Sequence, residues 1–128
     1  MKILKRWLIP AFFTLAALLL FKTFLLIGYV PTASMEPTLP EGSIIIGLRT
    51  FGKLEKGDII IFEHEGRLLV KRIAACSGDM VEVHGTETAV PERSYYVLGD
   101  NAKNSLDSRF WQDPFVPEEH VAAVLIGK

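Results

Sequence analysis

The sequence is poor in the residue types that build many catalytic centres. Its one cysteine, Cys76, excludes a disulfide within the chain. There is no Cys-x-x-Cys pair, no glycine-rich phosphate loop and no Gly-x-Ser-x-Gly motif. The three histidines, His64, His84 and His120, lack the i, i+4 spacing of a helical metal site, so we expect neither a metal nor a cofactor.

These few residues have plain structural interpretations. A catalytic thiol at Cys76 would need a histidine base, and none is adjacent in sequence, so we expect a small buried residue in a strand. We expect the histidines at exposed turns or strand edges. Sequence order alone leaves a histidine-based serine triad open.

Acidic residues are absent from the first 30 positions, which contain four of the 14 lysines and arginines. That segment has net charge +4, and the remaining 98 residues have −5 within the overall −1. Such a balance lacks the basic patch of a nucleic-acid binder, so we expect no nucleic-acid partner. Hydrophobic residues make up 49% of the chain, too many for a disordered one.

The apolar part of this leader runs from Trp7 to Tyr29, and a helix of that length rises about 33 Å, enough to cross a bilayer core. The basic residues before it predict a cytoplasmic N-terminus. We therefore expect three parts: a cytoplasmic segment at 1–6, a transmembrane helix at 7–29, and an extracytoplasmic domain at 30–128. Two alternatives are a cleavable signal peptide and a helix buried in a soluble core.

The remaining residues form short apolar runs rich in Ile, Val, Tyr and Phe, with turn residues every eight to twelve positions. This pattern is typical of an all-β fold, here a small β-barrel or sandwich. His64-Glu65-Gly66 is expected at the tip of a hairpin. The expected strands are 43–48, 58–62, 67–76, 80–84, 94–98 and 120–126.

Three segments have unusual chemistry for plain structure: Ser34–Leu39, the strand 68–75 and the polar run Gly99–Arg109. Each is also compatible with a simple loop or with an edge strand whose cations reach water. Alternation nevertheless points Lys71 or Arg72 toward apolar neighbours. Desolvation lowers the pKa of a lysine, and a neutral lysine can take a proton from a serine hydroxyl.

Together these segments resemble the sequence boxes of type I signal peptidases, membrane-bound serine proteases of the Ser–Lys class. Ser34–Leu39 resembles the nucleophile box, and Gly57–Phe62 resembles the strand box that follows. Val70–Ile73 with Gly78-Asp79 resembles the lysine box, and Gly99–Arg109 resembles the last box. The four occur in the family's order after one apolar span. The chain departs from the pattern at 74–77, at Ala102, and in the short interval between 79 and 99.

The resemblance implies a role for each matching position. Ser34 would be the nucleophile and Lys71 the general base, with the Ser34 N–H and the Thr32 hydroxyl as the oxyanion hole. Ser105 would orient the lysine amine. The remaining implied roles are an ion pair between Asp107 and Arg109, and a shallow pocket for small side chains lined by Met35 and Val70.

The implied activity is removal of signal peptides from exported preproteins after Ala-x-Ala-like sequences, at the plasma or inner membrane. Preproteins and membrane lipid are the expected partners. Phe110, Trp111 and Phe115 are candidates for the lipid interface or for the core. Two other functions stay open: a silent membrane-tethered β-domain that binds a partner, and a peptidase with one dedicated substrate, of the conjugation, pilus or mitochondrial inner-membrane type.

Overall fold

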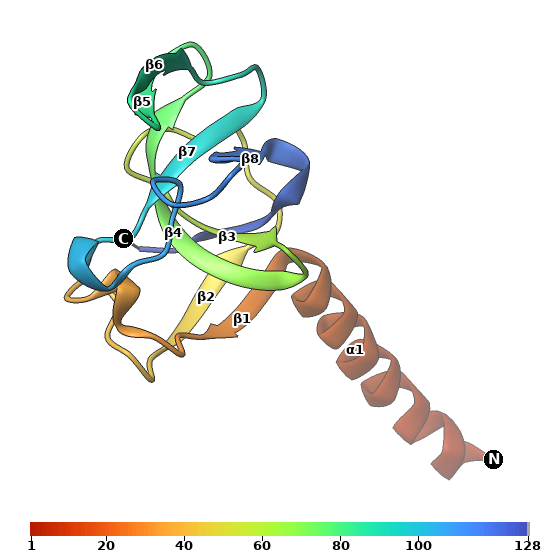
Figure 1. Cartoon of the computed structure of the whole chain (residues 1–128). Helices are drawn as coiled ribbons and strands as arrows, with labels where there is room; N and C mark the ends of the chain where they lie inside the picture. The colour runs from red at the N-terminus through yellow and green to blue at the C-terminus, as the bar shows by residue number, and fades with distance from the viewer. Residues whose placement is uncertain (128) are drawn as a thin grey trace.

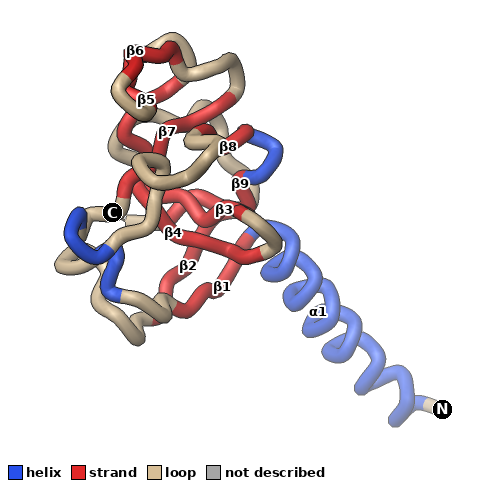
Figure 2. The backbone as a smooth tube through the Cα atoms, in the orientation of Figure 1, coloured by secondary structure: helices blue, strands red, loops and turns tan. Residues whose placement is uncertain are grey.

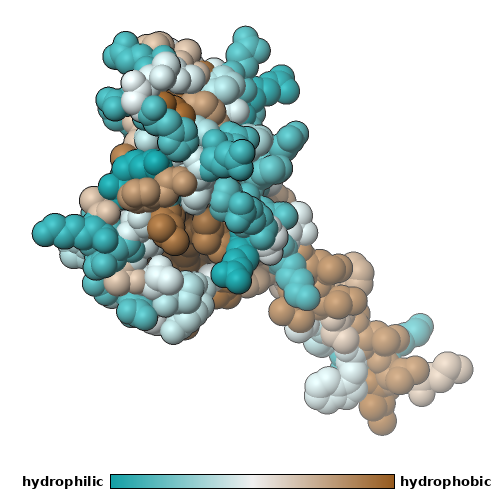
Figure 3. All heavy atoms as spheres, in the orientation of Figure 1, coloured by the Kyte–Doolittle hydropathy of each residue, from teal (hydrophilic) through white to brown (hydrophobic). Residues whose placement is uncertain are grey.

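The computed structural model describes residues 1–127 and consists of one long N-terminal helix followed by a β-rich domain. Helix α1 (Lys2–Phe24) extends away from the strands, and none of its residues is buried (Figure 1). It is long and apolar enough to cross a membrane. Hydrophobic residues cover much of its surface in Figure 3.

The helix ends five residues earlier than the span expected from the sequence at 7–29. Residues Leu25–Tyr29 form strand β1, which pairs antiparallel with β2 (Ile44–Leu48). The largely apolar run does not mark this boundary, because its apolar residues suit both a helix and a strand, and only pairing with β2 distinguishes the two. The β-rich part therefore begins at residue 25 rather than 30.

Seven strands form the main sheet, and every neighbouring pair is antiparallel. Its order is β1-β2-β9-β3-β4-β7-β8, so the sheet is sandwich-like and does not close into a barrel. A separate hairpin of two strands lies at the top of the view, away from α1 (Figures 1 and 2). The remaining strands are β3 (Ile59–His64), β4 (Arg67–Cys76), β5 (Met80–Val83), β6 (Thr86–Ala89), β7 (Ser94–Leu98), β8 (Phe115–Pro117) and β9 (Val121–Leu125).

Strand β3 divides the core, because it is buried on both faces. Ile59 and Ile61 pack into one cluster with Leu26 and Met35. Ile60 and Phe62 pack into a second cluster with residues of β7 and β8. Alternate side chains of a strand point to opposite faces, so four consecutive apolar residues supply both layers.

The expected β3–β4 hairpin is confirmed, with His64 opposite Arg67 and Glu65-Gly66 as the turn. Both turn residues have positive φ, 49° and 76°, which fits the tight reversal. Strand β4 lies between β3 and β7, but only its second half, Arg72–Cys76, pairs on both sides, whereas Arg67–Lys71 pairs with β3 alone. This position allows the fold to bury a side chain of β4.

Candidate active site

Three segments far apart in the sequence meet at one end of the sheet. Two are the short 3-10 helices η1 (Ala33–Met35) and η2 (Ala102–Asn104), which lie side by side (Figure 1). The third is β4, which contributes Lys71. The Lys71 Nζ atom donates a hydrogen bond of 2.7 Å to the Ser34 Oγ atom, and the two residues are only 4% and 6% exposed.

Burial changes the chemistry of this lysine. Desolvation disfavours the ammonium form and lowers the pKa of Lys71, while the negative charge of Asp107 opposes the shift. A lysine with a lowered pKa loses its proton more readily near neutral pH. Its amine then lies within hydrogen-bond distance of the hydroxyl that it would deprotonate.

The hydroxyl of Ser34 has a second neighbour, two residues earlier in the chain. Thr32 Oγ1 donates a 3.2 Å hydrogen bond to Ser34 Oγ, so both hydroxyls lie on the same side of the loop. Within residues 1–127 the Ser34 N–H donates to no other backbone group. The Thr32 hydroxyl is therefore hydrogen-bonded to the serine oxygen, and the Ser34 N–H has no backbone acceptor in the described part of the chain.

Asp107 organises the loop after β7. Its fully buried carboxylate pairs with Arg109 Nε at 2.9 Å and accepts hydrogen bonds from the Gly99 N–H and the Ser105 hydroxyl at 3.0 and 2.8 Å. Burial alone would raise the pKa of Asp107, but these donors hold it below its ordinary value. Ser105 therefore donates its hydrogen bond to Asp107. Among the described residues Lys71 Nζ donates only to Ser34, so the expected hydrogen bond between Ser105 and the lysine amine is not formed.

Arg72 and Asp100 form an ion pair that was not predicted from the sequence. Arg72 donates from Nε and Nη2 to the two carboxylate oxygens at 2.9 and 2.8 Å, and from Nη1 to the Gly57 carbonyl at 2.7 Å. This pairing holds the pKa of Asp100 below its ordinary value. It ties the strand that contains Lys71 to the 99–109 loop. The sequence signals for this ion pair were a basic residue, Arg72, next to Lys71 and an acidic residue, Asp100, within the polar run 99–109.

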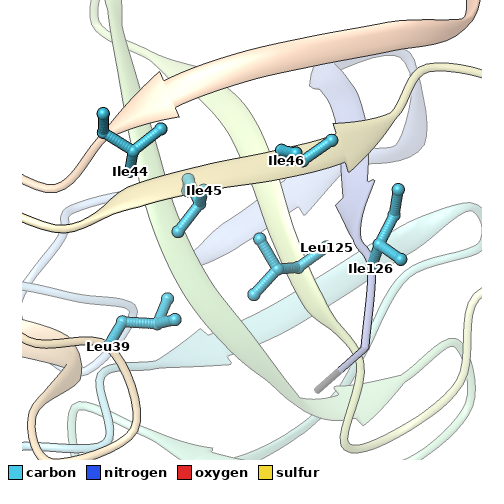
Figure 4. Close-up of a pocket in the computed structure, with 6 residues that line it drawn as sticks. All are labelled: Leu39, Ile44, Ile45, Ile46, Leu125 and Ile126. Atoms are coloured by element: carbon cyan, nitrogen blue, oxygen red, sulfur yellow. The ribbon is translucent and has the colours of Figure 1, made fainter.

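A groove of about 290 Å³ lies between β1 and β4, lined by Leu26, Gly28, Ile61, Val70 and others. Val70 is half-buried there, whereas Met35 is fully buried in the core beneath, so of the two expected pocket residues only Val70 lines this groove. A second depression is wholly aliphatic and has no group for acid–base chemistry (Figure 4). Its lining residues are Leu39, Ile44, Ile45, Ile46, Leu125 and Ile126.

The histidines and the cysteine lie elsewhere. His64 stacks on Trp111 with ring centroids 3.9 Å apart, and His84 and His120 are exposed. Burial raises the pKa of the half-buried Cys76 thiol, which keeps it protonated. Residues 1–127 contain no cluster of three or more His, Cys, Asp or Glu side chains that could hold a metal ion.

The three aromatic residues near the 99–109 loop differ in environment. Trp111 packs edge-on against Phe62, and Phe115 packs against Tyr96, so both contribute to the core. Phe110 is 59% exposed, with the Arg109 guanidinium 5.0 Å from its ring centroid. Only Phe110 presents most of its side chain to the surroundings.

The family model described as "Signal peptidase, peptidase S26" matches residues 4–88 and 84–127. The chain belongs to this signal peptidase family. Its matched ranges include the whole cluster around Ser34 and Lys71, and they also include most of α1. The family resemblance given by the four boxes is thereby confirmed.

Curated relatives agree with the assignment. The chain is 31% identical to "Probable signal peptidase I-2" of Synechocystis sp., over 71% of this chain and 56% of the relative. It is 29% identical to "Signal peptidase I" of Leptolyngbya laminosa, over 73% and 63%. It is 28% identical to "Signal peptidase I S" of Bacillus subtilis, over 71% and 70%. The chain thus spans less than two-thirds of the length of the first two.

Proposed function

We propose that this chain is a membrane-bound serine endopeptidase that removes N-terminal signal peptides after Ala-x-Ala-like sites, with Ser34 as nucleophile and Lys71 as general base. The observation that carries the proposal is the 2.7 Å hydrogen bond between two buried groups, Lys71 Nζ and Ser34 Oγ. A lysine buried beside a serine hydroxyl is an activated-nucleophile arrangement, and the family membership of the chain agrees with it.

The reaction follows from the positions of these groups. Neutral Lys71 takes the Ser34 proton as Oγ bonds to the scissile carbonyl carbon, and the carbonyl oxygen becomes an oxyanion. The Ser34 N–H and the Thr32 hydroxyl would donate to that oxygen. The C–N bond then breaks, the lysine proton passes to the leaving amine, and water releases the acyl group by the same two steps.

Substrate binding is proposed along two strand edges. Strand β1 pairs only with β2, and residues Arg67–Lys71 of β4 pair only with β3 in the described part of the chain. Both edges border the groove that contains Gly28 and Val70. An extended peptide placed there could add as a strand, which would bring its backbone to Ser34. Small side chains would suit so shallow a groove.

The membrane part of the proposal rests on α1 and on the charges before it. Lys2, Lys5 and Arg6 precede the apolar stretch, which favours a cytoplasmic N-terminus with the β-rich domain on the other side of the membrane. The side chains of Ile27, Tyr29 and Ile44 on β1 and β2 are more than half exposed, which suits a surface close to lipid. Substrates held in the same membrane would meet the site at high effective concentration.

The decisive experiment compares cleavage of a preprotein with an Ala-x-Ala signal by the full chain and by Ser34→Ala and Lys71→Met. Each should lower kcat/KM by at least about 10³-fold, because either removes the nucleophile–base pair. Ser77→Ala and Lys103→Met, both at exposed positions, are the matched controls and should cleave normally. Wild-type kcat/KM should also rise with pH through the lowered pKa of Lys71.

Full activity in either dyad variant would refute the assignment. Binding of signal peptides without cleavage by the wild type would favour a silent partner-binding domain instead. Cleavage of one precursor among several would indicate a dedicated peptidase.

A further inference from the structure

Asn101 makes two contacts with the backbone around Ser34. Its side-chain Nδ2 atom donates to the Ala33 carbonyl at 3.0 Å, and its own N–H donates to the Ser34 carbonyl at 2.9 Å. The two carbonyls flank the Ser34 Cα atom. One residue of the 99–109 loop therefore fixes the peptide planes on both sides of the serine.

The hydrogen bond from the Asn101 side chain acts on the peptide unit that contains the Ser34 N–H. The Ala33 carbonyl and the Ser34 N–H belong to a single planar peptide unit and point in opposite directions. Holding the carbonyl in place therefore aims the N–H. A hydrogen bond received by the carbonyl oxygen also polarises the unit, which makes its N–H a stronger donor.

The Ala33 carbonyl receives a second hydrogen bond from the Glu36 N–H at 3.1 Å, so both of its lone pairs are used. The Ser34 N–H at the other end of the unit donates to no backbone group within residues 1–127. The unit thus accepts two hydrogen bonds at its carbonyl, and its N–H has no backbone acceptor among the described residues.

We propose that Asn101 is a positioning residue that orients and polarises the Ala33–Ser34 peptide, so that the Ser34 N–H stabilises the oxyanion of the transition state. The proposal rests on the proposed function, since it needs Ser34 as nucleophile. Asn101 touches no reacting atom and acts only through the peptide unit.

The test uses the full chain in detergent micelles and the variant Asn101→Ala, which removes the side-chain donor and keeps the backbone one. Asn104→Ala is the matched control, because Asn104 is exposed at the end of the short helix that follows Asn101. For Asn101→Ala we expect kcat to fall about 10–100-fold with KM changed by less than about 3-fold, since an oxyanion donor acts in the transition state. The midpoint of the pH profile should not move.

Two further measurements separate this role from a general structural one. A peptide boronate ending in Ala-x-Ala forms a tetrahedral adduct with Ser34 Oγ, and its affinity should fall by the same factor as kcat/KM. Binding of an uncleaved signal peptide, measured in a Ser34→Ala background, should be unchanged. The amide nitrogen resonance of Ser34 should shift in Asn101→Ala, because its peptide loses a hydrogen bond.

Unchanged kcat would overturn the proposal. So would a parallel loss of signal-peptide binding, or a shifted pH midpoint, since either indicates a displaced loop rather than a weakened donor. A wild-type chain that cleaves no preprotein would instead refute the proposed function. In that case an unshifted Ser34 amide resonance would also refute the polarisation of the peptide, and a shifted one would support it.

Discussion

Replacing Asp107 by asparagine keeps the shape of a buried side chain and removes its charge. The carboxylate accepts five hydrogen bonds of 2.8–3.2 Å: one from the Gly99 N–H, one from the Ser105 hydroxyl and three from Arg109. An asparagine offers one oxygen and places an NH₂ group where the other oxygen stood. At least two of the five donors would then face another donor.

The expected cost follows from those two contacts. The better of the two orientations leaves the Arg109 N–H and Nε without an acceptor, and a hydrogen bond to a charged group contributes about 1.5–3 kcal/mol. The Arg109 side chain is 33% exposed, so water replaces part of the loss. We expect Asp107→Asn to lower the free energy of unfolding by about 2–4 kcal/mol, or Tm by about 10–25 °C.

The pH dependence identifies the cause. The pKa of Asp107 is lowered in the folded chain, so its stabilisation is present above its ordinary 3.8 and is lost as pH falls through the folded value. The difference in Tm between wild type and variant should therefore shrink in strong acid. Thermal unfolding of the full chain in micelles, followed by circular dichroism, measures this.

Asp113→Asn is the matched control, because its side chain is exposed and the Phe115 N–H that it accepts can bind an amide oxygen equally well. A Tm for Asp107→Asn within about 2 °C of wild type at neutral pH would refute the reasoning. A difference that stays constant down to the lowest pH would refute the ionic explanation.

Two other substitutions test the packing of the site. Lys71→Met should stabilise the fold by about 1–3 kcal/mol below the lowered lysine pKa, since it removes a buried charge. This gain should vanish as the pH rises to 10.5, because the wild-type lysine then loses its charge. Chemical denaturation at a series of pH values measures the difference in stability. Gly99→Ala would place a Cβ atom 2.6 Å from the Ser34 carbonyl oxygen. It should cost about 1–3 kcal/mol and lower kcat, whereas Gly52→Ala, with open space, should do neither.

The strands were predictable where turn residues bracket them. The 67–76 strand was predicted at its observed bounds, because turn residues lie on both sides of it: Gly66 directly before it and Ser77-Gly78 directly after it. Strands β6 and β8 were missed. β6 has only one hydrophobic residue and pairs solely within its hairpin, and β8 has three residues held by β7.

The site was predictable in part for a different reason. The chemistry of Ser34 and Lys71 could be inferred from residue type and from the order of the four boxes, and the structure brings these residues within hydrogen-bond distance. Their roles stay predictions. The hydrogen bonds that Arg72 and Asn101 donate to backbone carbonyls could not be inferred, because such bonds leave no spacing pattern in a sequence. They depend on how two loops approach each other.

The junction between α1 and β1 has a geometric consequence for an anchored chain. No loop separates Phe24 from Leu25, and Arg49 donates to both carbonyls, at 2.8 Å from its N–H and 3.1 Å from Nε. A helix seated in a bilayer would therefore set the tilt of the sheet. The height of Ser34 above the lipid would then be fixed by the fold, so a suitable peptide bond farther from the membrane would lie beyond its reach.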